Sequence, residues 1–212
     1  MSSAAALLLA LALARGAGAA GGESDLLWQL PAGEACRLRL VNDAGAVEVL
    51  TGGTAARLLG VAGRTRAEAT ATEDAILLTV SAPPDAAPGE SRVILEAPGA
   101  CELFLRAGQG EIEVHGPRLG RLAAETTTGD ITLWVGPSGG VAAELATSGE
   151  ITVDFSVTID YFPHQEPAKH GKITTGVGAS SARLTSLQGA IRVLRLRPGQ
   201  FENRSLETGV GP

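Results

Sequence analysis

Short segments of alternating aliphatic and polar residues recur along the chain, and each opens on a glycine. The segments are GEIEV, GDITL, GEITV, GKITT and GAIRV, at residues 110–114, 129–133, 149–153, 171–175 and 189–193. Alternation with a period of two is typical of a strand with one buried face. Recurrence every 18 to 22 residues is typical of a chain wound in coils, in which each unit buries its apolar face against the next.

A second alternating strand precedes several of these glycines, as in residues 122–126 and 141–145. We therefore predict an all-β, single-domain β-solenoid of about five coils of ~20 residues, over residues 36–196. Successive coils should place Ile112, Ile131 and Ile151 in one interior row. A degenerate first copy is GAVEV at residues 45–49.

Two sections depart from the repeat. Residues 61–99 contain the short apolar runs ILLTV at 76–80 and VIL at 93–95, which predict extra strands flanking the first coils. Residues 157–170 interrupt a later coil, and we interpret them as an inserted loop. Loops on a regular scaffold often carry function.

The two ends of the chain differ in composition from the rest. Residues 4–14 are an unbroken Ala/Leu run followed by small residues, which predicts a signal peptide over residues 1–20. The segment 197–212 is polar and is predicted to be a C-terminal tail. No later stretch is long and apolar enough to span a bilayer. We therefore expect an exported protein, located in the periplasm, at the cell surface or outside the cell.

The chain has two cysteines, Cys36 and Cys101, and each lies nine residues before a glycine of the repeat. Stacking of the two units in register would place their sulfurs about one strand spacing apart. The pattern predicts a disulfide in an oxidising compartment, and the alternative is a pair of buried thiols. The net charge of −6 and the pI near 5.1 give no basic footprint for nucleic acid.

The stretch LRLVNDAGAVEV at residues 38–49, the repeated Gly-Asp/Glu-Ile-Thr units and GVGA at 176–179 resemble the bacterial adhesin-like domain family of unknown function. The resemblance covers about residues 36–196 and implies an exported β-solenoid. It supplies no catalytic residues.

The position after each glycine should face outward, and stacking of the coils in chain order puts three carboxylates there in succession. They belong to Glu111, Asp130 and Glu150, and Lys172 would follow. Carboxylate oxygens suit Ca²⁺ or a cationic partner, while screening by water is the structural alternative.

The next outward column is rich in threonine and includes Thr132, Thr152 and Thr174. Such a column stabilises strands and could also bind a polysaccharide. Trp134 should point outward, either to stack on sugar or to pack under the inserted loop. Other candidate binding residues are Tyr161, Phe162 and His164 of that loop.

Catalytic signals are weak. The GPSGG stretch at residues 136–140 matches G-x-S-x-G, but that motif needs a helix after the serine, and none is indicated here. His164, Glu166 and His170 do not have the spacing of a helical metal site. His115 is interpreted as an isolated polar residue at a corner. We expect no catalytic residues and no cofactor.

The sequence therefore predicts a non-enzymatic adhesin-like domain that binds an unknown envelope protein or glycan through a strand face or the inserted loop. One alternative is a polysaccharide-acting enzyme on a β-helix scaffold. Another is a structural or regulatory envelope protein that binds another protein.

Overall fold

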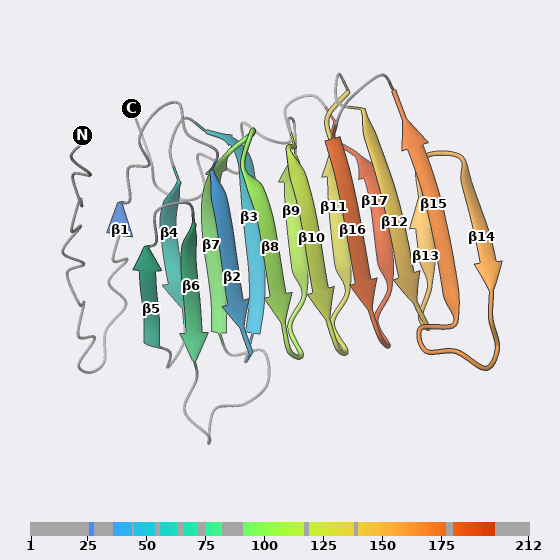
Figure 1. The fold of residues 1–212 in the computed structure, drawn as a ribbon, viewed down its shortest axis with the longest axis horizontal. Coiled ribbons are helices and arrows are strands. Elements are labelled where there is room, and N and C mark those ends of the chain that lie inside the picture. The colour runs from blue at the N-terminus through green and yellow to red at the C-terminus, as the bar shows by residue number, and fades with distance from the viewer. Residues whose placement is uncertain are drawn as a thin grey trace, which may run out of the picture.

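The computed structural model describes residues 26–27, 36–43, 45–53, 56–62, 66–71, 75–81, 91–116, 119–137, 140–176 and 180–197. Every regular element within these ranges is a strand, and the strands form two sheets, one behind the other, with the strand axes aligned (Figure 1). The predicted signal peptide and all but the first residue of the predicted tail lie outside the described residues. Among those described, no helix is long and apolar enough to cross a membrane.

Sheet A has eight strands and sheet B has nine. In spatial order, sheet A consists of β1 (Leu26–Leu27), β4 (Arg57–Ala62), β7 (Ser91–Pro98), β3 (Gly45–Gly53), β9 (Ile112–Gly116), β11 (Ile131–Val135), β17 (Ile191–Arg195) and β13 (Ile151–Val153). Sheet B consists of β14 (Val157–Tyr161), β15 (Lys169–Thr175), β12 (Val141–Thr147), β16 (Ser180–Ser186), β10 (Arg121–Thr126), β8 (Glu102–Ala107), β2 (Arg37–Asn42), β6 (Ile76–Ser81) and β5 (Arg66–Ala71).

The core lies between the sheets, as the period-two pattern predicts. Alternate residues of each central strand are buried, and nearly all of them are Leu, Ile, Val or Ala. The chain alternates between the sheets, because β8, β10, β16 and β12 in sheet B are followed by β9, β11, β17 and β13 in sheet A. Each of these strands pairs in parallel with its counterpart in the next strand pair.

The predicted interior row exists, but its order differs from the order along the chain. Ile112 is in register with Ile131, Ile131 with Ile191, and Ile191 with Ile151. The copy at residues 189–193 therefore lies between the copies at residues 129–133 and 149–153. The chain leaves the stack after β13, forms β14 and β15, and returns through β16, which takes the edge of β12 that faces β10.

The fourth copy of the repeat is not a member of this stack. Residues 171–175 belong to β15, which pairs antiparallel with β12 and β14 in sheet B. Gly171 lies in the middle of the strand, not at a corner. The prediction that residues 171–175 form a further equivalent copy is therefore wrong, because alternation in sequence is common to both kinds of strand.

The corner glycines of the remaining copies form a continuous contact across the strand pairs. A Cβ on Gly110 would lie 1.8 Å from the carbonyl oxygen of Gly45, and one on Gly129 would lie 2.0 Å from that of Gly110. Gly189 meets Gly129 in the same way, and Gly149 meets Gly189. The two described glycines with positive φ are Gly52 and Gly176. The corner glycines are therefore required for close backbone approach, and not for an unusual φ.

Buried hydroxyls stabilise these corners. Thr126 Oγ1 donates to the carbonyl of Gly110 and accepts from the amide of Gly129, over 3.1 Å and 3.2 Å. Ser186 and Thr147 repeat the arrangement one and two strand pairs further along. A serine or threonine two or three residues before the glycine is thus part of the repeat, and the sequence pattern contained this signal.

The section 61–99 supplies one end of both sheets. β6 extends sheet B in parallel beyond β2, and β7 extends sheet A in parallel beyond β3. The two short runs predicted as strands are β6 and part of β7. β5 adds an antiparallel edge strand to sheet B, which its polar sequence did not indicate. β4, most of which precedes this section, pairs antiparallel with β7 in sheet A.

Candidate binding surfaces

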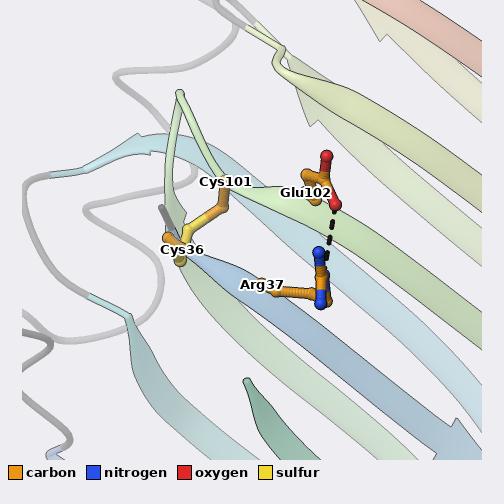
Figure 2. The surroundings of a disulfide bond; sticks show 4 residues. All are labelled: Cys36, Arg37, Cys101 and Glu102. Carbon is orange, nitrogen blue, oxygen red and sulfur yellow. Dashed lines mark hydrogen bonds and ion pairs between the residues drawn. A yellow bond between two sulfur atoms is a disulfide. The ribbon is translucent and has the colours of Figure 1, made fainter. Parts of the chain in front are cut away.

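A disulfide ties the start of two neighbouring strands. Cys36 and Cys101 directly precede β2 and β8, and the register of Arg37 opposite Glu102 brings the two cysteines side by side (Figure 2). Their Cα atoms are 4.5 Å apart and the sulfurs are bonded. Arg37 Nε also donates to Glu102 Oε2 over 3.2 Å. The structure therefore contains the disulfide that the equivalent positions predict.

The three carboxylates predicted to stand in succession are not consecutive. Ala190 separates Asp130 from Glu150, because β17 lies between β11 and β13. Lys172 is on sheet B and takes no part in the column. The predicted threonine column changes for the same reason: Arg192 lies between Thr132 and Thr152.

Both oxygens of Asp130 already have protein partners. Oδ1 accepts from the amide of Ala190 over 2.7 Å, and Oδ2 accepts from Arg192 over 2.7 Å. Burial by itself raises the pKa of Asp130, but these hydrogen bonds and the charge of Arg192 outweigh it and hold the pKa below its usual value. Asp130 is therefore a structural link between β11 and β17. The predicted column of cation-binding carboxylates thus lacks its middle residue.

A different cluster lies on the outer face of sheet A. Glu48 on β3 and His115 on β9 are buried, and Glu113 on β9 is partly exposed. His115 Nε2 is 3.1 Å from Glu113 Oε1 and 3.9 Å from Glu48 Oε1. The interpretation of His115 as a polar surface residue is wrong, because the register of β3 with β9 places it beside two carboxylates.

Side chains from the adjacent strands complete this cluster. Arg92 on β7 donates to Glu48 Oε2. Trp134 on β11 stacks on His115, with ring centroids 6.0 Å apart and planes 9° from parallel, and its Nε1 donates to Glu113 Oε1 over 3.0 Å. Trp134 therefore lies on the outer face, as predicted, but it packs on a histidine and not under the inserted loop.

The cluster has the donor types of a metal site. One ligand atom from each of Glu48, Glu113 and His115 can lie within 4.8 Å of the other two. Imidazole and carboxylate together suit Zn²⁺ and similar ions. Each carboxylate, however, already has a protein partner in Arg92 or Trp134, so the arrangement is explained as a polar network that joins β7, β3, β9 and β11.

The outer face of sheet B has a shallow groove that runs across the strands. One hollow of about 610 Å³ is lined by β6, β2, β8 and β10, and a second of about 580 Å³ continues it to β15. The two share Phe104, Ala123 and Glu125. The side chains of Ala123, Ala142 and Ser181 are short, so the groove is deeper at these positions than at their neighbours. At about 4.8 Å per strand, seven strands span roughly 29 Å.

The charge of this groove is opposite to that of the whole chain. The exposed cations along it are Arg37, Arg39, Arg106, Arg121, Lys172 and Arg183. Arg37 and Arg183 are paired with Glu102 and Glu144. Within the described ranges Arg39, Arg106 and Arg121 form no ion pair, so three guanidiniums face solvent around Phe104. The sequence did not indicate this groove, because the arginines lie on three strands far apart in the chain.

The inserted segment forms the other exposed surface. It consists of β14, a turn and the start of β15, at the end of sheet B (Figure 1). Ile159, Tyr161 and Phe162 are 45%, 64% and 41% exposed. His164 is exposed in the turn, and His170 bonds the carbonyl of Pro167. His164, Glu166 and His170 do not form a metal-ligating group among the residues described.

The G-x-S-x-G match lies between two strands. β11 ends at Val135 and β12 begins at Val141. Ser138 lies outside the described residues. The described part of this connection has no helix, which the catalytic motif requires after its serine.

Comparison with known proteins supports the fold and not an activity. No protein-family model matches the chain, and no curated protein matches its sequence. A crystal structure of a candidate cell adhesion protein from Clostridium sporogenes aligns with a TM-score of 0.52 and 12% identity, over 82% of this chain and 99% of that one. The chain shares the fold of that protein. A candidate adhesin from Bacteroides fragilis aligns at a TM-score of 0.21 and 8% identity, too low to inform the fold.

Proposed function

We propose that the protein is an exported, adhesin-like binding domain without enzymatic activity, and that its two sheets are the faces of a β-solenoid. The alternation of the chain between sheets supports the solenoid, because each strand pair meets the next in parallel register. The disulfide supports export, since such bonds persist in oxidising compartments. The fold shared with a candidate cell adhesion protein agrees with this role.

The binding surface in this proposal is the groove on sheet B, and the ligand is a linear anionic polysaccharide of the cell envelope. The observation that carries it is the set of guanidiniums around Phe104 that form no ion pair with any described residue, on a protein of net charge −6. Guanidinium groups bind carboxylates in bidentate geometry. An aromatic side chain between them gives a sugar ring an apolar surface.

The same groove favours binding over hydrolysis. Most glycoside hydrolases use two carboxyl groups that flank the scissile bond. In this groove Glu125 is the carboxylate without an ion pair among the described residues, while Glu102 and Glu144 are held by arginines. A polymer held by arginines across several strands would gain affinity from each contact and would remain intact.

The test uses titration calorimetry with polygalacturonate, a linear carboxylated polymer, and with dextran as the neutral polymer. The wild type should bind polygalacturonate, and the affinity should fall as salt is added. The double variant Arg39→Gln/Arg106→Gln should bind at least about tenfold more weakly, because two charge-assisted contacts are lost. Phe104→Ala should also weaken binding.

Arg195→Gln removes one positive charge from sheet A, and it is the matched control for each of the single variants Arg39→Gln and Arg106→Gln. It should change the affinity by less than about twofold. Equal binding of dextran, or equal loss in the control, would contradict the proposal. Release of new reducing ends from the polymer would instead identify the enzyme alternative.

A further inference from the structure

Sheet B ends on a strand that combines a free edge with exposed apolar side chains. β14 pairs with β15 on one side, and no described strand pairs with its other side (Figure 1). Three of the five exposed large hydrophobic side chains in the described part of the chain are Ile159, Tyr161 and Phe162. Unpaired edges of this kind recruit another strand.

The opposite edge of sheet B has a different character. β5 has the sequence RAEATA, with Glu68 and Thr70 exposed. Charged and polar residues at an edge are a usual means to prevent pairing. The contrast indicates that β14 is the edge suited to a partner.

The register of β14 with β15 determines which backbone groups are free. The amide of Phe162 donates to the carbonyl of Ala168, so in an antiparallel ladder the residues at 158 and 160 also point their backbone groups toward β15. The amides and carbonyls of Val157, Ile159 and Tyr161 therefore point to the open edge.

We propose that a second copy of this chain pairs with this edge, with β14 antiparallel to β14 of the other copy about a two-fold axis at Ile159. Ile159 then faces its own equivalent, and Val157 faces Tyr161 of the other copy. Each of these three pairs exchanges two backbone hydrogen bonds, about six in total. The strand is self-complementary, as a two-fold interface requires.

The side chains fit this register. Val157, Ile159 and Tyr161 are opposite Ile173, Gly171 and Lys169, and Ile173 and Gly171 face the core. Sheet A ends at β13 and does not cover β14 (Figure 1). Pairing therefore brings six apolar side chains together. On the other face Asp160 lies opposite a threonine, Thr158, so the carboxylates of the two copies are not opposed.

The pairing would join two copies of sheet B into one continuous sheet. Both grooves would then lie on the same face, and a polymer that spans both would bind with a higher effective concentration at the second groove. The dimer itself does not depend on the proposed ligand, so its test is independent of binding.

Size-exclusion chromatography with light scattering, on the oxidised protein from about 1 to 100 µM, measures the assembly directly. The wild type should be a dimer in the upper part of this range. Ile159→Lys should be monomeric, because the axis would oppose two ammonium groups. Leu187→Lys is the matched control, since Leu187 is 38% exposed and lies in the turn after β16, and it should remain dimeric.

A second measurement tests the register. Ile159→Cys should form an interchain disulfide with its equivalent, because directly paired Cα atoms are about 5.5 Å apart, within the range for a disulfide. Thr158→Cys should not, since its equivalent is displaced by two residues along the partner strand. A monomeric wild type, open-ended oligomers, a monomeric Leu187→Lys or equal crosslinking of both variants would overturn the proposal.

Discussion

Two glycines that look equivalent in the sequence should respond very differently to the addition of a methyl group. Gly129 and Gly171 each open a copy of the repeat. A Cβ on Gly129 would lie 2.0 Å from the carbonyl oxygen and 2.4 Å from the carbonyl carbon of Gly110. On Gly171 the nearest atom would be Leu145 Cβ, at 3.4 Å.

The atoms that a Cβ on Gly129 would meet belong to the backbone, so no side chain can rotate away. Relief requires β11 to move by about 1 Å, and overpacking of a core costs about 1–3 kcal/mol. The movement also stretches the bonds from Ser186 to the carbonyl of Gly129 and from the amide of Gly129 to Thr126, each worth about 1 kcal/mol. We expect Gly129→Ala to lower the free energy of unfolding by about 3–5 kcal/mol.

Gly171→Ala should change the free energy of unfolding by less than about 1 kcal/mol. Its methyl group would make an ordinary contact with Leu145. The loss of glycine reduces the entropy of the unfolded chain, which by itself stabilises the folded state by less than about 1 kcal/mol. The assay is urea unfolding of the oxidised protein, followed by circular dichroism. Equal destabilisation by the two variants would refute the reasoning, since Gly171 would then occupy a corner like that of Gly129.

Three further predictions concern the links between strands. Thiol titration of the denatured, non-reduced protein should find no free thiol at Cys36 or Cys101, and two free thiols would contradict the disulfide. Reduction should lower the free energy of unfolding by about 4 kcal/mol, since the bond closes a loop of 65 residues. Thr126→Val should cost about 1–3 kcal/mol, because a buried amide and a buried carbonyl of the corner glycines lose their partner, whereas the exposed Thr127→Val should be nearly neutral. The pKa of Asp130 is lower in the folded state, so the stability that its ionised carboxylate contributes is present above the unfolded-state pKa of about 4 and is lost as the pH falls through the folded-state pKa. Asp130→Asn should therefore lower the melting temperature at pH 7. A difference in melting temperature from the wild type that persists undiminished near pH 2 would contradict the assignment.

The sequence determined the local features of the fold and not the order of its parts. Alternation identified the buried faces of β9, β11 and β17 and the partly buried face of β13, and the shared spacing to glycine identified the disulfide partners. Both signals depend on one strand and its neighbour. We also expected the copies to stack in the order in which they occur along the chain, and no residue in the sequence supports that assumption.

The candidate sites show the same limit. Glu48, Glu113 and His115 converge because β3 and β9 are adjacent, yet Glu48 and His115 are 67 residues apart in a chain with few histidines. The acidic column was expected from a stack in chain order, and the insertion of β17 removed it. A site on a sheet face depends on which strands are neighbours, so it becomes visible only when the strand order is known.

The strand order itself follows from contacts that the copies share. Gly129, Gly149 and Gly189 offer the same bare backbone and the same carbonyl, and Thr126, Thr147 and Ser186 offer the same hydroxyl. Apart from the bonds of Asp130 to Ala190 and Arg192, these shared contacts do not favour one order of the copies over another. What distinguishes them is the connection: β14 and β15 occupy the far edge of β12, and the returning strand then fits between β10 and β12. The inserted segment thus determines both the order of the stack and the position of the exposed edge at which we propose a second copy binds.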